Sequence, residues 1–211
     1  MDSLSMKPEE IEAESFRIID AEAGEHDWRD AEWQVVRRAI HTSADFEYAR
    51  SLVFSEDAVG QALAALKSGC NIVTDTNMAL SGISKARLAP FGNKVVCHVA
   101  DPDVAEQARR DGVTRSIAAM RKALKDPDNR IFVIGNAPTA LFELLRLLGE
   151  GKADPALIIG LPVGFVGAEE SKIALAATTR PVPFITNMGR KGGSNVAAAV
   201  VNALAILAAN S

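Results

Sequence analysis

The sequence predicts an α/β protein, and three observations carry this prediction. Short apolar runs occur at 72–74, 94–99, 131–135, 157–160 and 183–186. Helical segments separate these runs, and glycines stand at the expected ends of several of the helices. This alternation is typical of parallel strands that are covered by helices on both faces. We therefore expect a flavodoxin-like, doubly wound, mainly parallel five-stranded sheet in three layers.

The N-terminal part of the chain is predicted to be helical. Pro8 and the two glutamates after it suit a first helical turn, and Gly24 suits the end of that helix. Apolar residues at helical spacing predict a second helix over 28–40. His41 then lies at its C-terminal end, where the helix dipole favours a cation. We expect the helices of 7–41 to pack on the α/β core.

Beyond residue 55 the remaining elements follow a regular alternation. Ser55 is expected to cap a helix that ends at Gly69, just before the strand at 72–74. The segment 45–54 is ambiguous between strand and helix. The strands that follow are each succeeded by a helix, and these helices are expected over 101–112, 138–149, 167–177 and 194–209.

Composition restricts the class of protein. A chain of 211 residues with 48% hydrophobic content can bury a full core, so we expect a single domain over 1–211. The net charge is −4 and basic residues are interspersed with acidic ones, which argues against a nucleic-acid partner. No apolar run approaches the roughly 18 residues of a membrane span. The N-terminal segment lacks the apolar stretch of a signal peptide, and we expect a cytoplasmic protein.

The loop TNMGRKGGSN after the last strand predicts an anion site. In open parallel sheets ligands bind beyond the carboxyl ends of the strands. Gly189, Gly192 and Gly193 let the backbone curl around an anion, and Arg190 and Lys191 add positive charge. The loop matches neither the Walker pattern nor GxGxxG. A glycine-rich turn with two solvated cations is the alternative and stays open.

Other loops and helix starts offer polar groups to a ligand. Asn136 follows a buried strand directly, and Thr139 lies in the first turn of the next helix, so these two residues either bind a ligand or form a turn and a cap. Arg115 lies at a predicted helix start. Phe165, between Gly164 and Val166, either lines the pocket of a flat ligand or belongs to the core.

The histidines and cysteines do not predict a metal site. His41 has no cysteine or second histidine at ligand spacing, and Cys70 and Cys97 are expected to be buried free thiols. His98 is expected to be structural and His26 solvent-exposed. His41 on its own is either a helix-capping residue or an acid–base catalyst.

Taken together, the motifs resemble the precorrin-8X methylmutase family of corrin-ring synthesis. The resemblance extends from about residue 7 to 208. It rests on ESFRIIDAE (14–22), VVRRAIHTSADFEYA (35–49), GCNIVTDTNMALSGI (69–83), GVTRSIAAM (112–120), VIGNAPTALFELL (133–145), GLPVGFVGAEESK (160–172) and GRKGGSNVAAAVVNAL (189–204).

The resemblance implies an isomerase of cobalamin biosynthesis that moves a methyl group from carbon 11 to carbon 12 of a tetrapyrrole-derived macrocycle. The product is hydrogenobyrinic acid or its cobalt-containing equivalent. The resemblance implies no cofactor, and it implies a homodimer whose substrate lies at the subunit interface. The substrate is flat, apolar and fringed with carboxylates, which suits apolar walls, backbone amides and arginines.

The resemblance also assigns roles to residues. His41 matches the family's acid, which protonates the ring system and so lowers the barrier to the methyl shift. Ser15 matches a residue that touches the substrate. The polar fringe of the substrate is expected to meet Arg38, Thr42, Arg115, Asn136, Thr139, Arg190, Lys191, Gly192 and Gly193.

Two other classes of function stay open from the sequence. A corrinoid-binding carrier would use the same loops without chemistry, and a phosphate-ester or nucleotide enzyme would use the GRKGG loop differently. A corrinoid enzyme that holds its product tightly could also pass it directly to the next enzyme of the pathway. Whether the ring carries cobalt is open as well, because the macrocycle would hold the metal.

Overall fold

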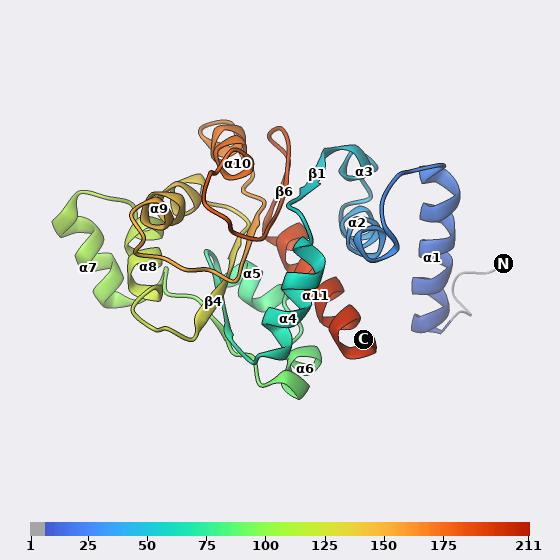
Figure 1. The fold of residues 1–211 in the computed structure, drawn as a ribbon, viewed down its shortest axis with the longest axis horizontal. Coiled ribbons are helices and arrows are strands. Elements are labelled where there is room, and N and C mark those ends of the chain that lie inside the picture. Colours follow the sequence, from blue (N-terminus) through green and yellow to red (C-terminus); the bar gives the residue numbers. More distant parts are fainter. Residues whose placement is uncertain (1–6) are drawn as a thin grey trace.

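A six-stranded mixed sheet forms the centre of the computed structural model, which describes residues 7–211 (Figure 1). The strand order is β1-β6-β5-β4-β2-β3. β1 pairs antiparallel with β6, and the other neighbouring strands pair in parallel. The strands are β1 (Leu52–Phe54), β2 (Asn71–Thr74), β3 (Val95–Val96), β4 (Asn129–Ile134), β5 (Leu157–Gly160) and β6 (Phe184–Asn187).

The expected α/β class is confirmed, but the expectation of five strands was wrong. The additional strand, β1, comes from the ambiguous segment 45–54, and it forms one edge of the sheet. Ser55 does not cap the following helix. Its backbone N–H donates to the carbonyl of Phe184 and its Oγ accepts from the N–H of Phe184, so it extends the pairing of β1 with β6. Asp57 is the residue before that helix.

The expected long helices are present, and shorter helices accompany them. The short helix α5 is not among the expected helices, and it begins where the Thr76 side chain accepts from the N–H of Ala79 and caps it. The helices are α1 (Pro8–Ala23), α2 (Asp30–Ser43), α3 (Tyr48–Ser51), α4 (Ala58–Lys67), α5 (Asn77–Gly82), α6 (Lys85–Leu88), the 3-10 helix η2 (Ala89–Phe91), α7 (Pro102–Asp111), α8 (Arg115–Ala123), α9 (Pro138–Gly149), α10 (Ala168–Ala176) and α11 (Ser194–Asn210).

Helices cover both faces of the sheet, because successive side chains of a strand point to opposite faces. Ile131 and Val133 of β4 belong to a core cluster with residues of α2, α4 and α11. Phe132 and Ile134 of the same strand belong to a second cluster with residues of α7, α8, α9 and α10. The sheet is thus the middle one of three layers (Figure 1).

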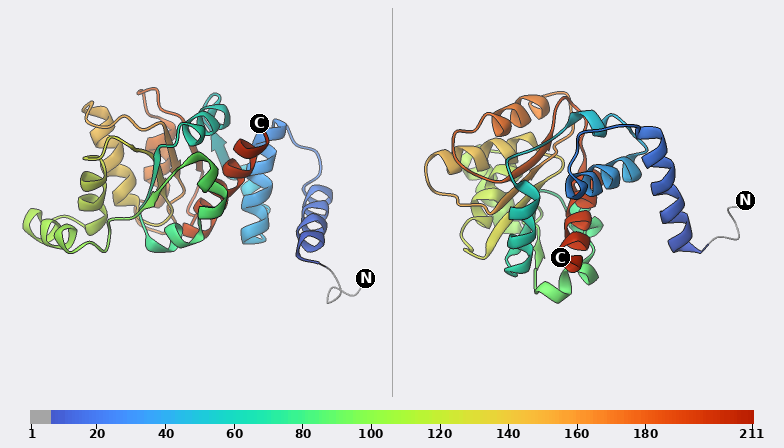
Figure 2. Two further views of the ribbon diagram at one scale, coloured as in Figure 1. Left: turned by 90° about the horizontal axis from the view of Figure 1, so that it is seen from below. Right: turned by 45° about the vertical axis from the view of Figure 1, so that its right-hand side comes forward.

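The two N-terminal helices lie on the side of the molecule formed by α11. α2 packs against α11, and α1 lies outside α2 in all views (Figures 1 and 2). Ile19 of α1 is buried, and Asp20 accepts hydrogen bonds from the Trp33 indole (2.9 Å) and from Arg37 (2.8 Å). These contacts attach α1 to α2. None of the helices within residues 7–211 combines the length and the apolarity that a bilayer crossing demands.

Candidate functional site

His41 lines an open cavity of about 310 Å³, which we call the His41 pocket. The imidazole is exposed and lies in the last turn of α2. The walls come from α2, from the region around α6 and from the middle of α11. The lining residues are Arg38, His41, Thr42, Ser84, Arg87, Ala199 and Asn202. One of the walls is fixed because Asn202 accepts from the backbone N–H of Ser84 at 2.8 Å.

α1 brings an aromatic ring and a carboxylate beside this pocket. The Phe16 ring lies 5.1 Å from the His41 ring, and the guanidinium of Arg38 lies 4.7 Å from the centre of the Phe16 ring. Glu12 accepts from Arg38 at 2.9 Å, and this hydrogen bond holds the pKa of the Glu12 carboxyl below its usual value. Ser15 lies on the same helical face as Glu12 and Phe16, the face toward α2.

A buried aspartate shapes the loop after β4. Asp75 is 1% exposed and follows β2 directly. Its carboxylate accepts the backbone N–H groups of Gly135, Asn136 and Ala137 at 2.9, 2.8 and 2.7 Å. Burial raises the pKa of Asp75, and these three donors oppose that shift. The contacts hold the exposed Asn136 at the carboxyl edge of the sheet.

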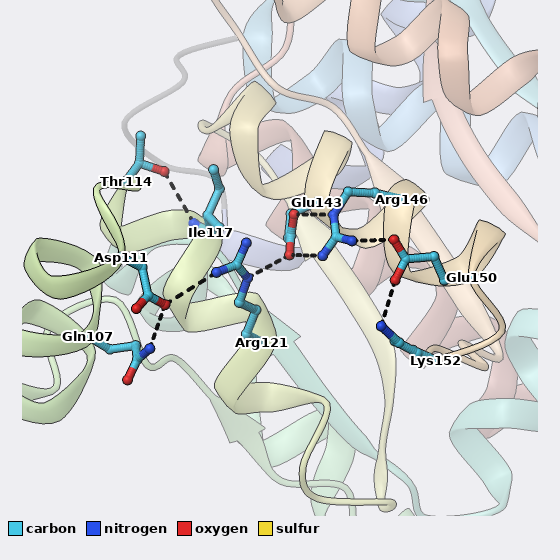
Figure 3. Close-up of polar contacts among 9 residues, drawn as sticks. All are labelled: Gln107, Asp111, Thr114, Ile117, Arg121, Glu143, Arg146, Glu150 and Lys152. Atoms are coloured by element: carbon cyan, nitrogen blue, oxygen red, sulfur yellow. Dashed lines mark hydrogen bonds and ion pairs between the residues drawn. The ribbon is translucent and has the colours of Figure 1, made fainter.

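Arg115 and Thr139 are brought together on the other side of the sheet. Arg115 is the first residue of α8, and the residue before it, Thr114, caps this helix and lies 3.2 Å from the Thr139 hydroxyl of α9. Figure 3 shows the ion-pair network that joins the two helices, with Arg121 of α8 donating to Glu143 of α9 at 2.7 Å.

The Glu143 side chain is the centre of this network. It is 5% exposed and also accepts from Arg146, whose guanidinium, together with that of Arg121, holds the pKa of Glu143 below its usual value (Figure 3). A buried carboxylate with two guanidinium partners fixes the relative position of α8 and α9. Arg115 and Thr139 are therefore presented on a rigid pair of helices.

The GRKGG loop is held from within at two of its three glycines, Gly192 and Gly193. The N–H of Gly193 donates to the carbonyl of Leu161 at 2.9 Å. A Cβ on Gly192 would lie 2.2 Å from that same carbonyl oxygen, so only glycine fits there. The ammonium of Lys191 lies 2.5 Å from Asp45 and 2.8 Å from Glu47, and these carboxylates raise its pKa. Arg190 is exposed.

Lys172 of α10 lies under this loop and is fully buried (0% exposed). Its ammonium donates to the carbonyl of Lys191 at 2.6 Å and to the Asn187 side-chain oxygen at 3.3 Å. Both acceptors are neutral, and burial lowers the pKa of Lys172 to about 8.

This lowered pKa predicts how stability depends on pH. Between about pH 8 and 10.5 the unfolded chain keeps a proton on Lys172 that the folded chain has lost, so this residue makes stability rise with pH in that window. Lys172→Met should abolish the rise. The difference in free energy of unfolding between wild type and variant should change by roughly 2 to 3 kcal/mol across the window. Urea unfolding of both proteins at about pH 8 and pH 10.5 checks this prediction. Free energies of unfolding that change with pH in parallel for the two proteins would contradict it.

The predicted site residues therefore form two groups, one beside the His41 pocket and one at the carboxyl edge of the sheet, and the ion pairs of Lys191 with Asp45 and Glu47 connect the second group to the segment after α2. Ser15, Arg38, His41 and Thr42 lie on α1 and α2, beside the His41 pocket. The residues of the second group lie on α8, on α9 and in the loops after β4 and β6, and we call this group the carboxyl-edge group. Its members are Arg115, Asn136, Thr139, Arg190, Lys191, Gly192 and Gly193.

Sequence reasoning missed three polar residues of these groups. Arg87 lines the His41 pocket, Asp75 holds the loop after β4, and Lys172 holds the loop after β6. Phe165 does not belong to the core, the second of its two expected positions: it is 84% exposed, and the guanidinium of Arg190 lies 5.6 Å from its ring centre. It belongs to the surface of the carboxyl edge.

The remaining histidines and cysteines lie apart from this arrangement. The Nδ1 atom of His98 is 2.9 Å from Asp101, and the exposed His26 stacks on Trp33. Cys70 is buried, and Cys97 is only partly buried. In the part of the chain from residue 7 onward, no group of three or more His, Cys, Asp or Glu side chains is placed to hold a metal ion.

Comparisons with known proteins agree with one family. The model of the family described as precorrin-8X methylmutase matches residues 10–207. Cobalt-precorrin-8 methylmutase of Priestia megaterium is 50% identical over 97% of this chain and 90% of its own length. Precorrin-8X methylmutase of Sinorhizobium sp. is 46% identical over 90% of each chain.

A solved structure agrees in its fold as well. The precorrin-8X methylmutase of Thermus thermophilus superposes with a TM-score of 0.88 at 45% identity, covering 96% of this chain and 97% of its own. The family match over residues 10–207 spans all six strands and every predicted site residue. The chain therefore belongs to the precorrin-8X methylmutase family, whose members are isomerases that transfer a methyl group within one molecule.

Proposed function

We propose that this chain moves a methyl group from C-11 to C-12 of precorrin-8X, or of cobalt-precorrin-8, and so gives hydrogenobyrinic or cobyrinic acid in cobalamin biosynthesis. The observation that carries the proposal is the position of His41. Its imidazole is exposed at the end of α2 and lines a cavity beside Arg38 and Arg87. The names of the relatives, all methylmutases of this ring system, support the reaction.

His41 acts as the general acid in this proposal. A proton given to the conjugated ring system lowers the barrier to the methyl shift, and the same imidazole takes it back when the product forms. Arg38 and Arg87 bind carboxylates at the ring edge, where a guanidinium gives strong charge-assisted hydrogen bonds. Ser15 and Thr42 add contacts from α1 and α2. The chemistry needs no metal of the protein's own, and cobalt, where present, is part of the substrate.

The carboxyl-edge group binds the rest of the polar fringe. Asn136 and Arg190 are exposed, and Arg115 and Thr139 stand on the two helices joined by the Glu143 network. The exposed ring of Phe165 beside Arg190 offers a flat apolar surface to the macrocycle. Lys191 contributes less charge than its sequence predicts, because Asp45 and Glu47 already neutralise it.

The separation of α2 from α8 supports a homodimer with an interfacial site, which the family resemblance also implies. α2 and α8 cover opposite faces of the sheet, and the His41 pocket is too small to enclose a macrocycle with its side chains. Met78, Phe165 and Val166 are 71%, 84% and 89% exposed near the carboxyl edge, and such apolar side chains suit an interface. We therefore place the ring between the His41 pocket of one protomer and the carboxyl-edge group of its partner.

Complementation between two impaired variants, assayed at a precursor concentration well below KM, tests this arrangement. His41→Ala and Arg115→Ala remove groups from different halves of the site. In a heterodimer with two-fold symmetry one of the two sites carries both changes and the other carries none. Co-refolding equal amounts should therefore restore about a quarter of wild-type activity. A mixture that forms dimers but stays at the level of the separate variants would show that each site lies within one protomer.

Incubation with the methylated ring precursor tests the reaction itself. Conversion is expected to change the absorbance spectrum of the ring and to leave an orange product bound to the protein. Tight binding without any spectral conversion would favour a non-catalytic corrinoid carrier instead. We further propose handover of the bound product to the next enzyme, and free exchange of product into buffer, independent of any partner, would contradict it.

Three wider assignments complete the proposal. The five parallel strands, numbered along the chain, follow the order 2-1-3-4-5, which supports a flavodoxin-like assignment with β1 added at the edge. The packing of α2 on α11 supports a single domain over 1–211. A cytoplasmic location stays a prediction from the sequence.

A further inference from the structure

The buried ammonium of Lys172 is a costly feature that the proposed chemistry does not use. A charged group inside a protein loses its hydration, and this loss is costly unless hydrogen bonds compensate for it. Lys172 points from α10 toward the end of β6, and its two acceptors belong to the segment that leads into the GRKGG loop. It is therefore a candidate for positioning that loop.

The contacts around Lys172 fix the turn 188–193 from several sides. The carbonyl of Lys191 accepts from the Lys172 ammonium at 2.6 Å and from the Asn187 side-chain amide at 2.9 Å. The same amide donates to the carbonyl of Met188 at 3.2 Å. On the far side of the turn the N–H of Gly193 donates to Leu161. These hydrogen bonds hold the carbonyls on the inner side of the turn. They do not engage the side chains on its outer surface.

The outer surface of the turn carries the groups that can meet a ligand. Arg190 is exposed, with its guanidinium over the Phe165 ring. The side chain of Lys191 leaves in another direction, toward Asp45 and Glu47. A rotation of the Lys191 peptide would move Arg190, because the two residues are neighbours in the turn. The carbonyl of Arg190 itself accepts from the N–H of Gly164 at 3.2 Å, and the clamp at the neighbouring Lys191 carbonyl is a second constraint on the position of Arg190.

We propose that Lys172 is a positioning residue, which clamps the carbonyl of Lys191 so that the turn 188–193 presents Arg190 to a carboxylate of the substrate. This inference rests on the proposed function, because it names the part of the site that Lys172 serves. Contacts to carboxylates far from the migrating methyl group stabilise the ground state and the transition state equally. The loss of such a contact therefore raises KM and leaves kcat nearly unchanged.

Two variants of the full-length enzyme test the clamp. Lys172→Met removes the donor and keeps the apolar stem, whereas Lys172→Gln keeps an N–H donor. Hydrogen exchange of the amides in 188–193 should accelerate about tenfold or more in Lys172→Met and less in Lys172→Gln. KM for the methylated ring precursor should rise about tenfold in Lys172→Met, with kcat within about threefold of wild type. Lys172→Gln should show a smaller rise in KM.

Leu66→Ala is the matched control for a general loss of stability. Leu66 is buried in α4 and belongs to the core cluster on the other face of the sheet. This variant should lower the melting temperature while KM and the exchange of 188–193 stay at wild-type values.

Unchanged exchange of 188–193 in Lys172→Met would overturn the clamp, and this readout does not depend on activity. Faster exchange with an unchanged KM would overturn the link to the substrate. A rise in KM that Leu66→Ala reproduces would also overturn it, because stability alone would then explain the effect. A wild-type protein that does not convert the precursor at all would instead contradict the proposed function, and hydrogen exchange would still decide whether Lys172 holds the turn.

Discussion

Replacement of His41 by alanine is expected to lower kcat of the methyl shift by about 100- to 10,000-fold, the usual contribution of a general acid. The other lining residues of the His41 pocket are hydroxyls, amides, arginines and an alanine, and none of these side chains is an efficient proton donor near neutral pH. The affinity for the product should change little, because the carboxylate contacts remain. Single-turnover absorbance measurements on the loaded enzyme give the rate directly.

His26→Ala is the matched control for this variant. His26 is also exposed, but it stacks on Trp33 at a ring separation of 4.0 Å and does not line the His41 pocket. Its replacement should leave kcat unchanged. If His41→Ala converts the ring as fast as wild type, the imidazole does not donate the proton, and the role of His41 reduces to that of a helix-terminal residue.

Replacement of Asp75 by alanine is expected to give the largest loss of stability, about 3 to 5 kcal/mol. The change leaves the N–H groups of Gly135, Asn136 and Ala137 without their acceptor, and each unpaired buried donor costs about 1 to 3 kcal/mol. Urea unfolding measures the loss as a lower midpoint at an unchanged slope. Asn136 should also lose its fixed position at the carboxyl edge.

Asp103→Ala controls for the loss of one carboxylate. Asp103 is exposed on α7 and, among the described residues, pairs with Lys122 across the surface, where water screens the ion pair and leaves it a small contribution to stability. Asp103→Ala should therefore leave the free energy of unfolding nearly unchanged. A loss for Asp75→Ala no larger than this would mean that water replaces the aspartate as acceptor and that the loop after β4 does not depend on it.

The sequence predicts the layered α/β arrangement because its signal is local. The parallel strands other than the edge strand β3 are largely buried and read as apolar runs, and each long helix carries its own start and stop residues, such as Gly24 and Gly112. β1 escapes prediction because its three residues owe their conformation to pairing with β6, about 130 residues later in the chain. α5 escapes because its cap, Thr76, resembles an ordinary loop residue.

The sequence predicts some residues of the candidate site and not others. His41 and the loop residues after the strands stand out, because unusual residue types gather at positions where ligands bind in such sheets. Asp75 and Lys172 do not stand out, because their partners lie 60 and 19 residues away in the sequence and act through the backbone. In sequence, Lys172 looks like a solvated lysine on an exposed helical face, and only the packing of α10 reveals its burial.

A crystal structure of the enzyme with its product bound is the sharpest test of the role of His41. We predict that a nitrogen of the His41 imidazole lies within about 3 to 4 Å of the macrocycle near C-11 and C-12. We also predict that arginines of the His41 pocket and of the carboxyl-edge group meet the ring's carboxylates. A product that is bound with its C-11 and C-12 region away from His41, in either protomer, would contradict this role.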